Sequence, residues 1–382
     1  MESPSTKDPL LLIGVDVRSL ARNAILHRRD FVLADRFGDA SLARRGECHT
    51  LGRAYGGESL TRGLADLVRG RHAEGVIYGA GFENDVLTLS RLGEVGPLLG
   101  CSLETVRKTR DPESLIRASR AWSFTYPDIR YKRQDLDTDS RWLTKPFAGL
   151  FGDGIRFADA EEGLRPGVFY QRHVPGFSSS ALVVSDGSEA FLLGVVANIA
   201  ADPVYGAEGF QYVGGIYPHP FAAEMGAAVT NMADALTLEF DIRGLWGFDF
   251  IYHGGVTLVM VEPRPPVGLE LINMATWNDL LGMHTDALTS KSSNHIIDPG
   301  PAGTSYGFAR VRAAEELIFS HGERWAERGA LDLPADGESV RAGQHLATLT
   351  ARGKSYSVVR DDLRQQALLL SRELGVAVAS SR

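Results

Sequence analysis

Residues 247–264 constrain the fold of this chain more than any other stretch. Two runs rich in β-branched and aromatic residues flank Gly254-Gly255, and this pattern predicts a β-hairpin with a two-residue turn. With that turn, Asp249 lies opposite Met260, and the carboxylates of Asp249 and Glu262 point to the same face because side chains alternate along a strand. A turn longer or shorter by one residue would send Glu262 to the other face.

Two carboxylates on one face, with Arg264 directly after them, suit a divalent cation that carries phosphate oxygens. Hard cations such as magnesium prefer oxygen ligands, and a guanidinium group matches the geometry of phosphate. The alternative interpretation is an ordinary hairpin that carries two solvated acids. The hairpin alone leaves both interpretations open.

The chain has 382 residues, more than one hydrophobic core usually serves, so we expect about two to four packed units. The net charge of −8 and the pI of about 5.7 argue against nucleic acid or an anionic membrane surface as the main partner. Two cysteines, Cys48 and Cys101, are too few for a disulfide framework, which fits a reducing cytoplasm. The polar start and the short apolar run at 10–17, interrupted by Asp16, predict neither a signal peptide nor a membrane span.

The first hundred residues have the pattern of a small α/β unit. Apolar runs at 10–17, 30–34 and 75–78 read as buried parallel strands, and a helix starts at Arg18. This order predicts a doubly wound sheet whose strand ends, near Asp16 and Gly79, line a crevice. No Gly-x-Gly-x-x-Gly follows the first strand, so the unit holds a small substrate or serves as a scaffold rather than binding a dinucleotide.

The middle of the chain contains a lysine and a glycine-rich loop. Residues 104–123 are helical in pattern, with a helix start at Asp111-Pro112. A strand then delivers Lys145, and the loop that follows can approach a ligand through bare backbone amides at Gly149, Gly152 and Gly154. A lysine together with a glycine-rich loop suggests a phosphate-binding site. The loop is not a Walker A motif, because the lysine precedes the glycines. An ordinary hairpin turn is the alternative.

Four motifs in this order resemble the ATP-grasp superfamily, which joins a carboxylate to an amine through an acyl phosphate. They are Lys145-Pro with its glycine loop, Tyr170-Gln-Arg-His-Val-Pro-Gly176, Gly247-x-Asp249, and Glu262-Pro-Arg264-Pro, and the resemblance covers about residues 10–290. Within the superfamily, the segments 15–21, 34–39 and 210–218 are similar to the group of tyramine–glutamate ligases of methanofuran and methylofuran synthesis.

The resemblance implies the architecture and the ligands. It implies an α/β chain, α+β in the ATP-binding part, with an N-terminal α/β domain at 1–100 and an ATP-grasp domain at 101–295. The ATP-grasp domain would divide into a lid at 140–200 and a metal-binding core at 201–295, and a small β-rich subdomain with a terminal helix would follow at 296–382. ATP and magnesium would be the cofactors, a small carboxylate and an amine the substrates, and a homodimer is common in the superfamily.

The resemblance also assigns roles to residues. Lys145 would contact the α- or β-phosphate, the loop with Gly149, Gly152 and Gly154 would fold over the triphosphate, and Lys108 would be a second, earlier phosphate-binding lysine. The strand from Gln171 would present the backbone of His173 and Val174 to adenine. The family usually places ribose-binding acids near here, whereas this chain has Phe177-Ser-Ser-Ser180, so that only Ser180 and its neighbours are available. Arg264 would stabilise the γ-phosphate in transfer or the acyl phosphate.

The hairpin departs from the family pattern. The usual ending is Glu-x-Asn-Pro-Arg, whereas this chain reads Met260-Val-Glu262-Pro-Arg264. A shift by two residues keeps the acid on the same face, so Asp249 and Glu262 would hold one magnesium while Met260 packs. Three alternatives follow: an ATP-dependent ligase, an ATP-grasp protein that binds nucleotide or metabolite without turnover, and a scaffold subunit of a ligase complex.

The remaining sequence carries less chemistry. Residues 278–288 read as an amphipathic helix in which His284 is a packed residue rather than a catalytic base. A turn-rich linker is expected at 299–304. Short strands around turns and a helix at 361–374 then predict the C-terminal subdomain, which we interpret as a structural closure.

Overall fold

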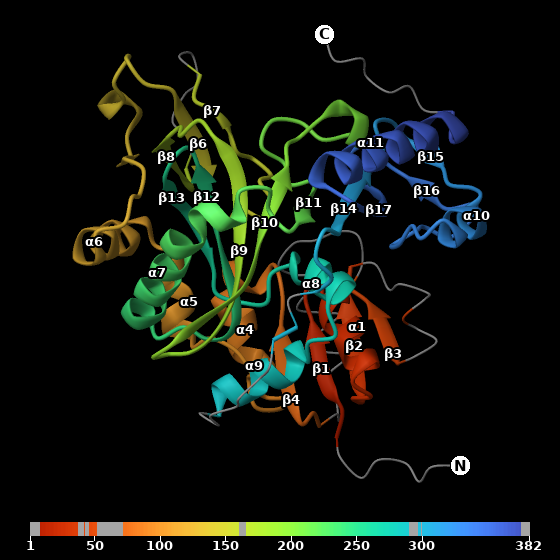
Figure 1. Cartoon of the computed structure of the whole chain (residues 1–382), viewed down its shortest axis with the longest axis horizontal. Coiled ribbons are helices and arrows are strands. Elements are labelled where there is room, and N and C mark those ends of the chain that lie inside the picture. Colours follow the sequence, from red (N-terminus) through yellow and green to blue (C-terminus); the bar gives the residue numbers. More distant parts are fainter. Residues whose placement is uncertain are drawn as a thin grey trace.

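The computed structural model describes residues 8–36, 42, 46–51, 72–159, 166–289, 297–298 and 300–375. Residues 37–39 of the 34–39 segment lie outside the described residues, as do the polar start at 1–7 and Pro299 of the expected linker. Figure 1 shows an N-terminal unit below a large central sheet, with a small lid sheet and the C-terminal segment above.

The N-terminal unit contains the predicted parallel sheet and adds one strand to it. In the order β3-β2-β1-β4, its strands are β3 (Glu47–Thr50), β2 (Phe31–Asp35), β1 (Leu10–Ile13) and β4 (Gly75–Tyr78). Every residue of β1, β2 and β4 is buried, which explains why these strands are apolar without alternation. Helix α1 (Arg18–Leu26) begins at the predicted residue.

Short helices lead from this unit to the lid: η1 (Phe82–Asn84), α4 (Val86–Leu92), α5 (Leu103–Arg110) and α6 (Pro112–Trp122). The predicted helix start at Asp111-Pro112 is confirmed. The Asp111 carboxylate accepts hydrogen bonds from the backbone amides of Glu113 (3.3 Å) and Ser114 (3.0 Å), and Pro112 fits the first turn because its missing amide is not needed there.

The lid is a four-stranded antiparallel sheet in the order β5-β8-β6-β7. Its strands are β5 (Ile129–Arg130), β8 (Val168–Arg172), β6 (Trp142–Pro146) and β7 (Arg156–Phe157), and η2 (Arg133–Asp135) lies between β5 and β6 in the chain. The lid therefore ends at β8, earlier than the expected boundary at residue 200.

The central sheet has seven strands, and all neighbouring strands are antiparallel. Its order is β13 (Val256–Glu262), β12 (Arg243–Tyr252), β9 (Phe177–Asp186), β10 (Ala190–Ile199), β11 (Gly214–Tyr217), β14 (Ser305–Arg312) and β17 (His345–Gly353). Helix α7 (Ala222–Phe240) packs on one face of β9 and β10, whereas α8 (Leu269–Ala275) and α9 (Leu280–Leu288) pack on the other. Alternate residues of β9 accordingly enter two different cores.

The expected packing role of His284 in α9 is confirmed. Its ring is fully buried, and Nδ1 accepts a hydrogen bond of 2.8 Å from the backbone amide of Leu245. Burial lowers the pKa of His284 to about 4, so the ring is neutral at physiological pH.

The hairpin β12–β13 differs from its prediction at the tip. Tyr252 pairs with Val256, so the loop has three residues, 253–255, and the predicted two-residue turn is wrong. A β-bulge at Val259 adds one residue to β13 between the pairs Phe250–Leu258 and Asp249–Met260. Because the bulge offsets the longer loop, Asp249 lies opposite Met260 and Gly247 opposite Glu262, and the predicted register at the acids is confirmed.

The C-terminal segment is rich in β-strands, as expected, but its two longest strands belong to the central sheet. Strands β14 and β17 extend the central sheet, and a separate pair consists of β15 (Leu317–Ile318) and β16 (Ser339–Val340). Helix α10 (Gly322–Glu327) accompanies this pair, η3 (Pro203–Tyr205) precedes β11, and α11 (Tyr356–Glu373) packs on β14 and β17. Helix α11 begins earlier than predicted because Ser355 caps it by accepting a hydrogen bond from the amide of Val358.

Ion pairs join the N-terminal unit to the rest of the chain. Arg22 donates to Glu270 of α8 at 2.7 Å, and Arg18 donates to Asp332 through Nε at 3.0 Å. Arg310 of β14 pairs with Asp16, which follows β1. Over its described residues, the chain contains no helix of the length and apolarity that a bilayer span requires.

Candidate active site

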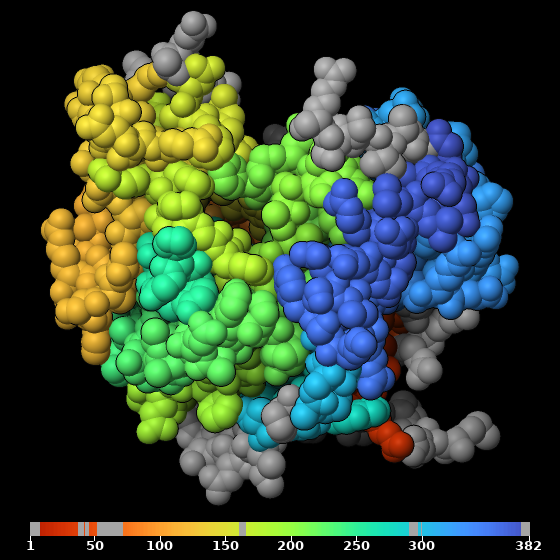
Figure 2. Space-filling model, turned by 45° about the horizontal axis from the view of Figure 1, so that its top comes forward, coloured from red at the N-terminus to blue at the C-terminus, as the bar shows by residue number. Residues whose placement is uncertain are grey.

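A cavity of about 560 Å³ lies between the lid and the hairpin side of the central sheet. Figure 2 shows the surface hollowed between the yellow atoms of the lid and the green atoms near residue 200. The cavity brings together most of the predicted site residues, namely Lys145, Gly149, Gly152, Gln171, His173, Val174, Ser180, Asp249 and Glu262. Three others, Lys108, Gly154 and Arg264, are not among its described lining residues.

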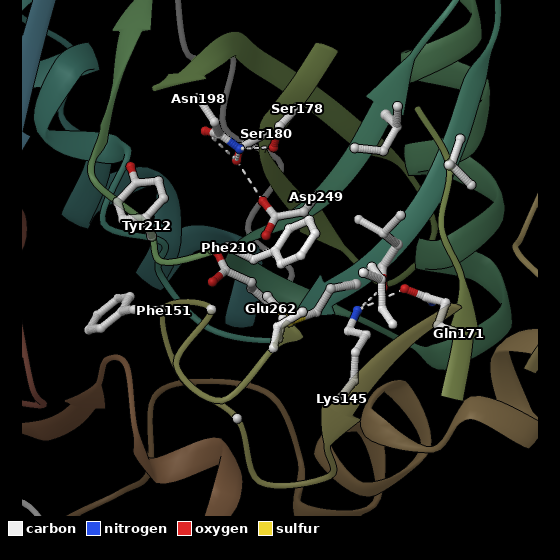
Figure 3. A pocket seen from close by; sticks show the side chains of 18 of the residues that line it. Lys145, Phe151, Gln171, Ser178, Ser180, Asn198, Phe210, Tyr212, Asp249 and Glu262 are labelled. Carbon is white, nitrogen blue, oxygen red and sulfur yellow. Dashed lines mark hydrogen bonds between the residues drawn. The ribbon is translucent and has the colours of Figure 1, made fainter. Parts of the chain in front are cut away.

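Lys145 reaches from the lid strand β6 toward the hairpin. Its Nζ donates to Oε1 of Gln171 at 3.0 Å and to the backbone carbonyl of Val259 at 3.3 Å (Figure 3). Burial, together with the nearby cation of Arg110, lowers the pKa of Lys145 to about 8, although Asp249 opposes this shift. An ammonium group with few neutralising partners is suited to receive an anion.

Asp249 is held by a hydrogen-bond ladder across three strands. Ser180 of β9 donates to Oδ1 of Asp249 at 2.6 Å, and Asn198 of β10 is linked to the Ser180 hydroxyl by contacts of 2.9 and 3.0 Å (Figure 3). Asn198 also donates to the hydroxyl of Ser178 at 3.2 Å. Burial, and then the charge of Glu262, raises the pKa of Asp249 to about 7, while the hydrogen bond from Ser180 opposes the rise.

Glu262 shares its carboxylate with Arg264. Nη2 of Arg264 donates to Oε1 of Glu262 at 2.8 Å and to Oε1 of Glu83 at 2.9 Å. Arg264 is 2% exposed, and burial would lower its pKa, but Glu262 and Glu83 outweigh this and raise it. The predicted phosphate ligand is therefore engaged by two carboxylates behind the cavity wall, and it would have to leave them to touch a phosphate.

The cation near the end of α5 that lines the cavity is not the lysine expected to bind phosphate. Lys108 lies on the outer face of α5, where it pairs with Glu104 one turn earlier at 2.7 Å. Arg110, at the end of the same helix, lines the cavity and donates to the carbonyl of Gly149 at 3.2 Å. Burial lowers the pKa of Arg110, and Glu83 opposes this. Arg110, and not Lys108, is therefore among the described residues that line the cavity.

The glycine loop is folded against the central sheet. Gly152 has φ +74°, and a Cβ there would lie 1.9 Å from the carbonyl oxygen of Phe210, so only glycine allows this approach. The carbonyl of Phe151 accepts a hydrogen bond of 2.8 Å from the amide of Tyr212, and their rings stack at 6.2 Å. The loop therefore closes one side of the cavity.

The strand end after β8 forms an aromatic corner. His173 packs edge-on against Phe157 at 5.2 Å and lies 6.2 Å from Phe210, and Phe157 contacts Phe210 at 5.3 Å. The backbone amide of His173 donates to the backbone carbonyl of Arg141 at 2.8 Å, so this amide already has a partner within the protein. Burial and Arg141 lower the pKa of His173, so its ring is neutral and suited to packing against a flat ligand.

The two hairpin acids fit a divalent cation. Asp249 and Glu262 both line the cavity, and their mutual repulsion indicates a place for positive charge. Within the described residues, no group of three or more His, Cys, Asp or Glu side chains is arranged as a metal site. Phosphate oxygens and water would supply the other ligands, as is usual for magnesium. Met260 also lines the cavity, so it is not enclosed in a dry core.

The two residues expected to line the crevice of the N-terminal unit are packed against other residues. Asp16 pairs with Arg310, and a Cβ on Gly79 would meet Val17 at 2.3 Å. Neither Asp16 nor Gly79 lines the described cavity. The N-terminal unit instead reaches the site through Glu83 and Asn84 of η1, the latter accepting a hydrogen bond from Arg110 at 3.0 Å.

Sequence reasoning missed three residues: Glu83, Arg110 and Asn198. Glu83 and Asn198 did carry a signal. Glu83 follows a buried strand at the carboxyl edge of a parallel sheet, where polar groups gather. Asn198 interrupts an otherwise apolar strand. Arg110 directly precedes a helix cap and has no distinguishing pattern.

Comparison with protein families matches residues 115–267 to the ATP-grasp domain. Comparison with curated protein sequences gave no match. Among solved structures, the chain is similar to L-amino acid ligase from Bacillus licheniformis, with a TM-score of 0.68 and 13% identity over 94% of this chain and 97% of that one.

Two further solved structures have the same fold. N5-carboxyaminoimidazole ribonucleotide synthetase from Thermus thermophilus has a TM-score of 0.62 and 18% identity, over 98% of this chain and 100% of that one. The biotin carboxylase domain of 2-oxoglutarate carboxylase from Hydrogenobacter thermophilus, solved with MgADP and bicarbonate, has a TM-score of 0.69 and 13% identity, over 94% and 90%. Residues 115–267 therefore match an ATP-grasp domain, and almost the whole length of the chain has an ATP-grasp fold.

Proposed function

We propose that this protein is an ATP-dependent ligase that joins a carboxylate to an amine through an acyl phosphate. The observation that carries the proposal is the convergence of Lys145, Arg110 and the acids Asp249 and Glu262 on one cavity inside an ATP-grasp domain. Two cations for phosphate and two acids for a metal ion are the parts that phosphoryl transfer needs.

The nucleotide has a natural orientation in this cavity. The aromatic rings of His173 and Phe210, which line the cavity, supply apolar surface for adenine, and the backbone of Val174 lies beside them. Lys145 and Arg110 lie further in, beside the glycine loop, where the phosphates would extend. Ribose would lie between these two regions, near the hydroxyls of Ser178 and Ser180.

Asp249 and Glu262 would hold magnesium at the phosphates. When bound, the ion would neutralise charge on the β- and γ-phosphates during transfer. The solved structure from Hydrogenobacter thermophilus contains MgADP, which supports magnesium as the ion that accompanies the nucleotide. The protein's own contribution is to keep Asp249 oriented through Ser180 and Asn198.

The reaction would proceed in two steps. A carboxylate oxygen of the substrate attacks the γ-phosphorus, the bond from that phosphorus to the bridging oxygen breaks, and ADP leaves. The amine then attacks the acyl carbon, the carbon–nitrogen bond forms, and inorganic phosphate leaves as the nitrogen loses a proton. Lys145 and Arg110 would stabilise the negative charge on the transferring group.

Several uncharged side chains of the cavity lining favour a substrate with an uncharged body. They are Leu182, Val196, Tyr212, Pro266 and Val267. An aromatic amine such as tyramine or tyrosine fits that surface, and the sequence motifs at 15–21 and 210–218 support glutamate as the acid. We therefore propose tyramine–glutamate or tyrosine–glutamate ligation, as in methylofuran synthesis, as the finer assignment.

The test is an assay of purified protein with ATP, magnesium, glutamate and either amine. ADP, phosphate and an amide product detected by mass spectrometry would support the proposal. AMP and pyrophosphate would indicate adenylation and contradict the acyl phosphate. ADP formed with other substrate pairs only would retain the ligase and reject the finer assignment.

A second candidate is an ATP-grasp protein that binds nucleotide without turnover. Two observations favour it: Met260 replaces a usual metal ligand, and Arg264 is engaged by two carboxylates. Nucleotide binding by calorimetry, together with no ADP formation over a broad panel of acids and amines, would select this candidate.

A further inference from the structure

Glu83 is a buried acid that belongs to the N-terminal unit but pairs with the hairpin arginine. It lies in η1, directly after the loop that follows β4, and it is 5% exposed. Its Oε1 accepts hydrogen bonds from Nε and Nη2 of Arg264 at 3.0 and 2.9 Å. Its Oε2 accepts one from the backbone amide of Gly81 at 2.5 Å. Both oxygens are therefore engaged, and Glu83 does not line the described cavity.

Nη2 of Arg264 also donates to Glu262, one of the two acids that we propose as metal ligands. Nη2 of Arg264 lies 2.9 Å from Glu83 and 2.8 Å from Glu262, so the two acids share one buried cation. Glu262 lines the cavity, whereas Glu83 is not among its described lining residues. Of the two acids that share Arg264, the one that lies at the cavity is therefore Glu262.

The charges around Arg264 balance when all groups are ionised. Three cations and three anions form this cluster: Arg110, Lys145, Arg264, Glu83, Asp249 and Glu262. A buried guanidinium without a counter-ion is costly. If Arg264 had Glu262 as its sole partner, Glu262 would be retained by it and a metal ion would have to compete for that carboxylate.

We propose that Glu83 is a positioning residue for the metal site: it neutralises Arg264 and so leaves Glu262 available to a divalent cation. This inference rests on the proposed function, because it takes Asp249 and Glu262 as the ligands. Glu83 of the N-terminal unit, which does not line the cavity, thereby controls whether Glu262 of the hairpin is available to bind the metal ion.

The test variant is Glu83→Gln, which keeps the side-chain volume and an acceptor oxygen but removes the charge. The probes are Mn²⁺, counted as free ion by electron paramagnetic resonance, and ADP, measured by calorimetry. We expect Mn²⁺ affinity in the presence of ADP to fall about tenfold or more, because Arg264 then holds Glu262 alone. Metal-free ADP should bind as well as to the wild type or better, because the cluster gains one positive charge.

A matched control is Glu270→Gln. Glu270 is also 5% exposed and also pairs with an arginine, Arg22, at 2.7 Å, but it lies at the contact between α1 and α8. Loss of a buried carboxylate charge in general would affect both variants, whereas the proposal expects normal Mn²⁺ and ADP affinities for Glu270→Gln.

A double variant separates misfolding from a failed inference. Glu83→Gln combined with Arg264→Met removes both charges, and neutral replacement of a buried pair is often tolerated. Glu262 is then free, so Mn²⁺ affinity should return to within about threefold of the wild type. This variant decides the matter if Glu83→Gln alone does not fold.

The outcomes distinguish the two proposals. Wild-type protein that binds neither ADP nor Mn²⁺ with ADP would overturn the proposed function and this inference with it. Normal binding by the wild type, with equal Mn²⁺ affinity in Glu83→Gln, would overturn the inference alone. A folded double variant that still binds Mn²⁺ weakly would also overturn it, since Arg264 would no longer be there to retain Glu262.

Discussion

Lys145 donates a hydrogen bond to the backbone carbonyl of Val259, the residue that the β-bulge adds to β13. A bulge takes a residue out of the regular ladder, and here the carbonyl of that residue faces the lid. The contact joins the lid to the hairpin at 3.3 Å, a long bond that an arriving phosphate can replace. It explains how a lysine from one sheet is held beside the acids of another.

We first predict that Lys145→Met weakens ADP and ATP binding by about 10- to 150-fold, because a charge-assisted hydrogen bond contributes about 1.5–3 kcal/mol. Isothermal calorimetry measures the loss. Lys108→Met is the control, since that lysine pairs with Glu104 on an exposed helix face and the affinity of this variant for nucleotide should change less than about twofold. Equal losses in both variants would mean that the lysines act through overall charge.

Arg110→Met should weaken nucleotide binding by a similar factor. Arg110 lines the cavity and lies near Lys145, so it adds positive charge where the phosphates would extend. Arg110→Lys keeps the charge and should recover part of the affinity. Binding that is insensitive to both substitutions would show that Arg110 serves its contacts to Gly149 and to Asn84 of η1 instead.

Metal affinity should depend on pH through Asp249. Its pKa is raised to about 7 in the metal-free site, so below that pH a cation must displace a proton. Mn²⁺ affinity in the presence of ADP should therefore increase between about pH 6 and pH 8 and level off above. Ser180→Ala removes a hydrogen bond that favours the charged form, so the inflection should move to higher pH. A pH-independent affinity in the wild type would contradict the assignment of Asp249.

Asp249→Asn should stabilise the metal-free protein at pH 8. The folded-state pKa is above the ordinary carboxyl value, so folding retains a proton between about pH 4 and pH 7, and stability falls as pH rises through that window. One pKa unit corresponds to about 1.4 kcal/mol, and partial solvation of the half-buried carboxylate reduces the cost, so we expect a gain of about 1–3 kcal/mol. Urea unfolding at pH 8 and at pH 4 measures it, with little difference expected at pH 4.

Met260 offers a test of the metal site itself. Met260→Leu is close to volume-conserving and should cost under about 1.5 kcal/mol of stability. Met260→Glu adds a carboxylate to a residue that lines the cavity opposite Asp249, so Mn²⁺ affinity should rise. An unchanged affinity in a folded Met260→Glu variant would place the metal elsewhere.

The secondary structure of the site could largely be predicted from local patterns. The buried strands, the cap at Asp111 and the face shared by Asp249 and Glu262 depend on alternation and turn chemistry, which are local. The exact hairpin tip could not be predicted, because Gly254-Gly255 suits either a two-residue turn or part of a longer loop.

The partners of the site residues could not be predicted, because they come from distant parts of the chain. Glu83 meets Arg264, 181 positions away, and Ser180 meets Asp249, 69 positions away. Lys108 and Arg110 show the same limit: they belong to one helix, and only the packing of α5 decides which of them lines the cavity.

The hairpin also shows how a site of this kind can keep its register while the shape of the tip changes. The stretch between Asp249 and Met260 can be divided into a short turn with a regular ladder or a longer loop with a bulge, and both divisions bring the same two residues opposite each other. An evolutionary change in the shape of the tip therefore leaves the acids in place as long as a bulge absorbs it. Alignments of such hairpins are best anchored on the acids, with gaps allowed at the loop or at the bulge.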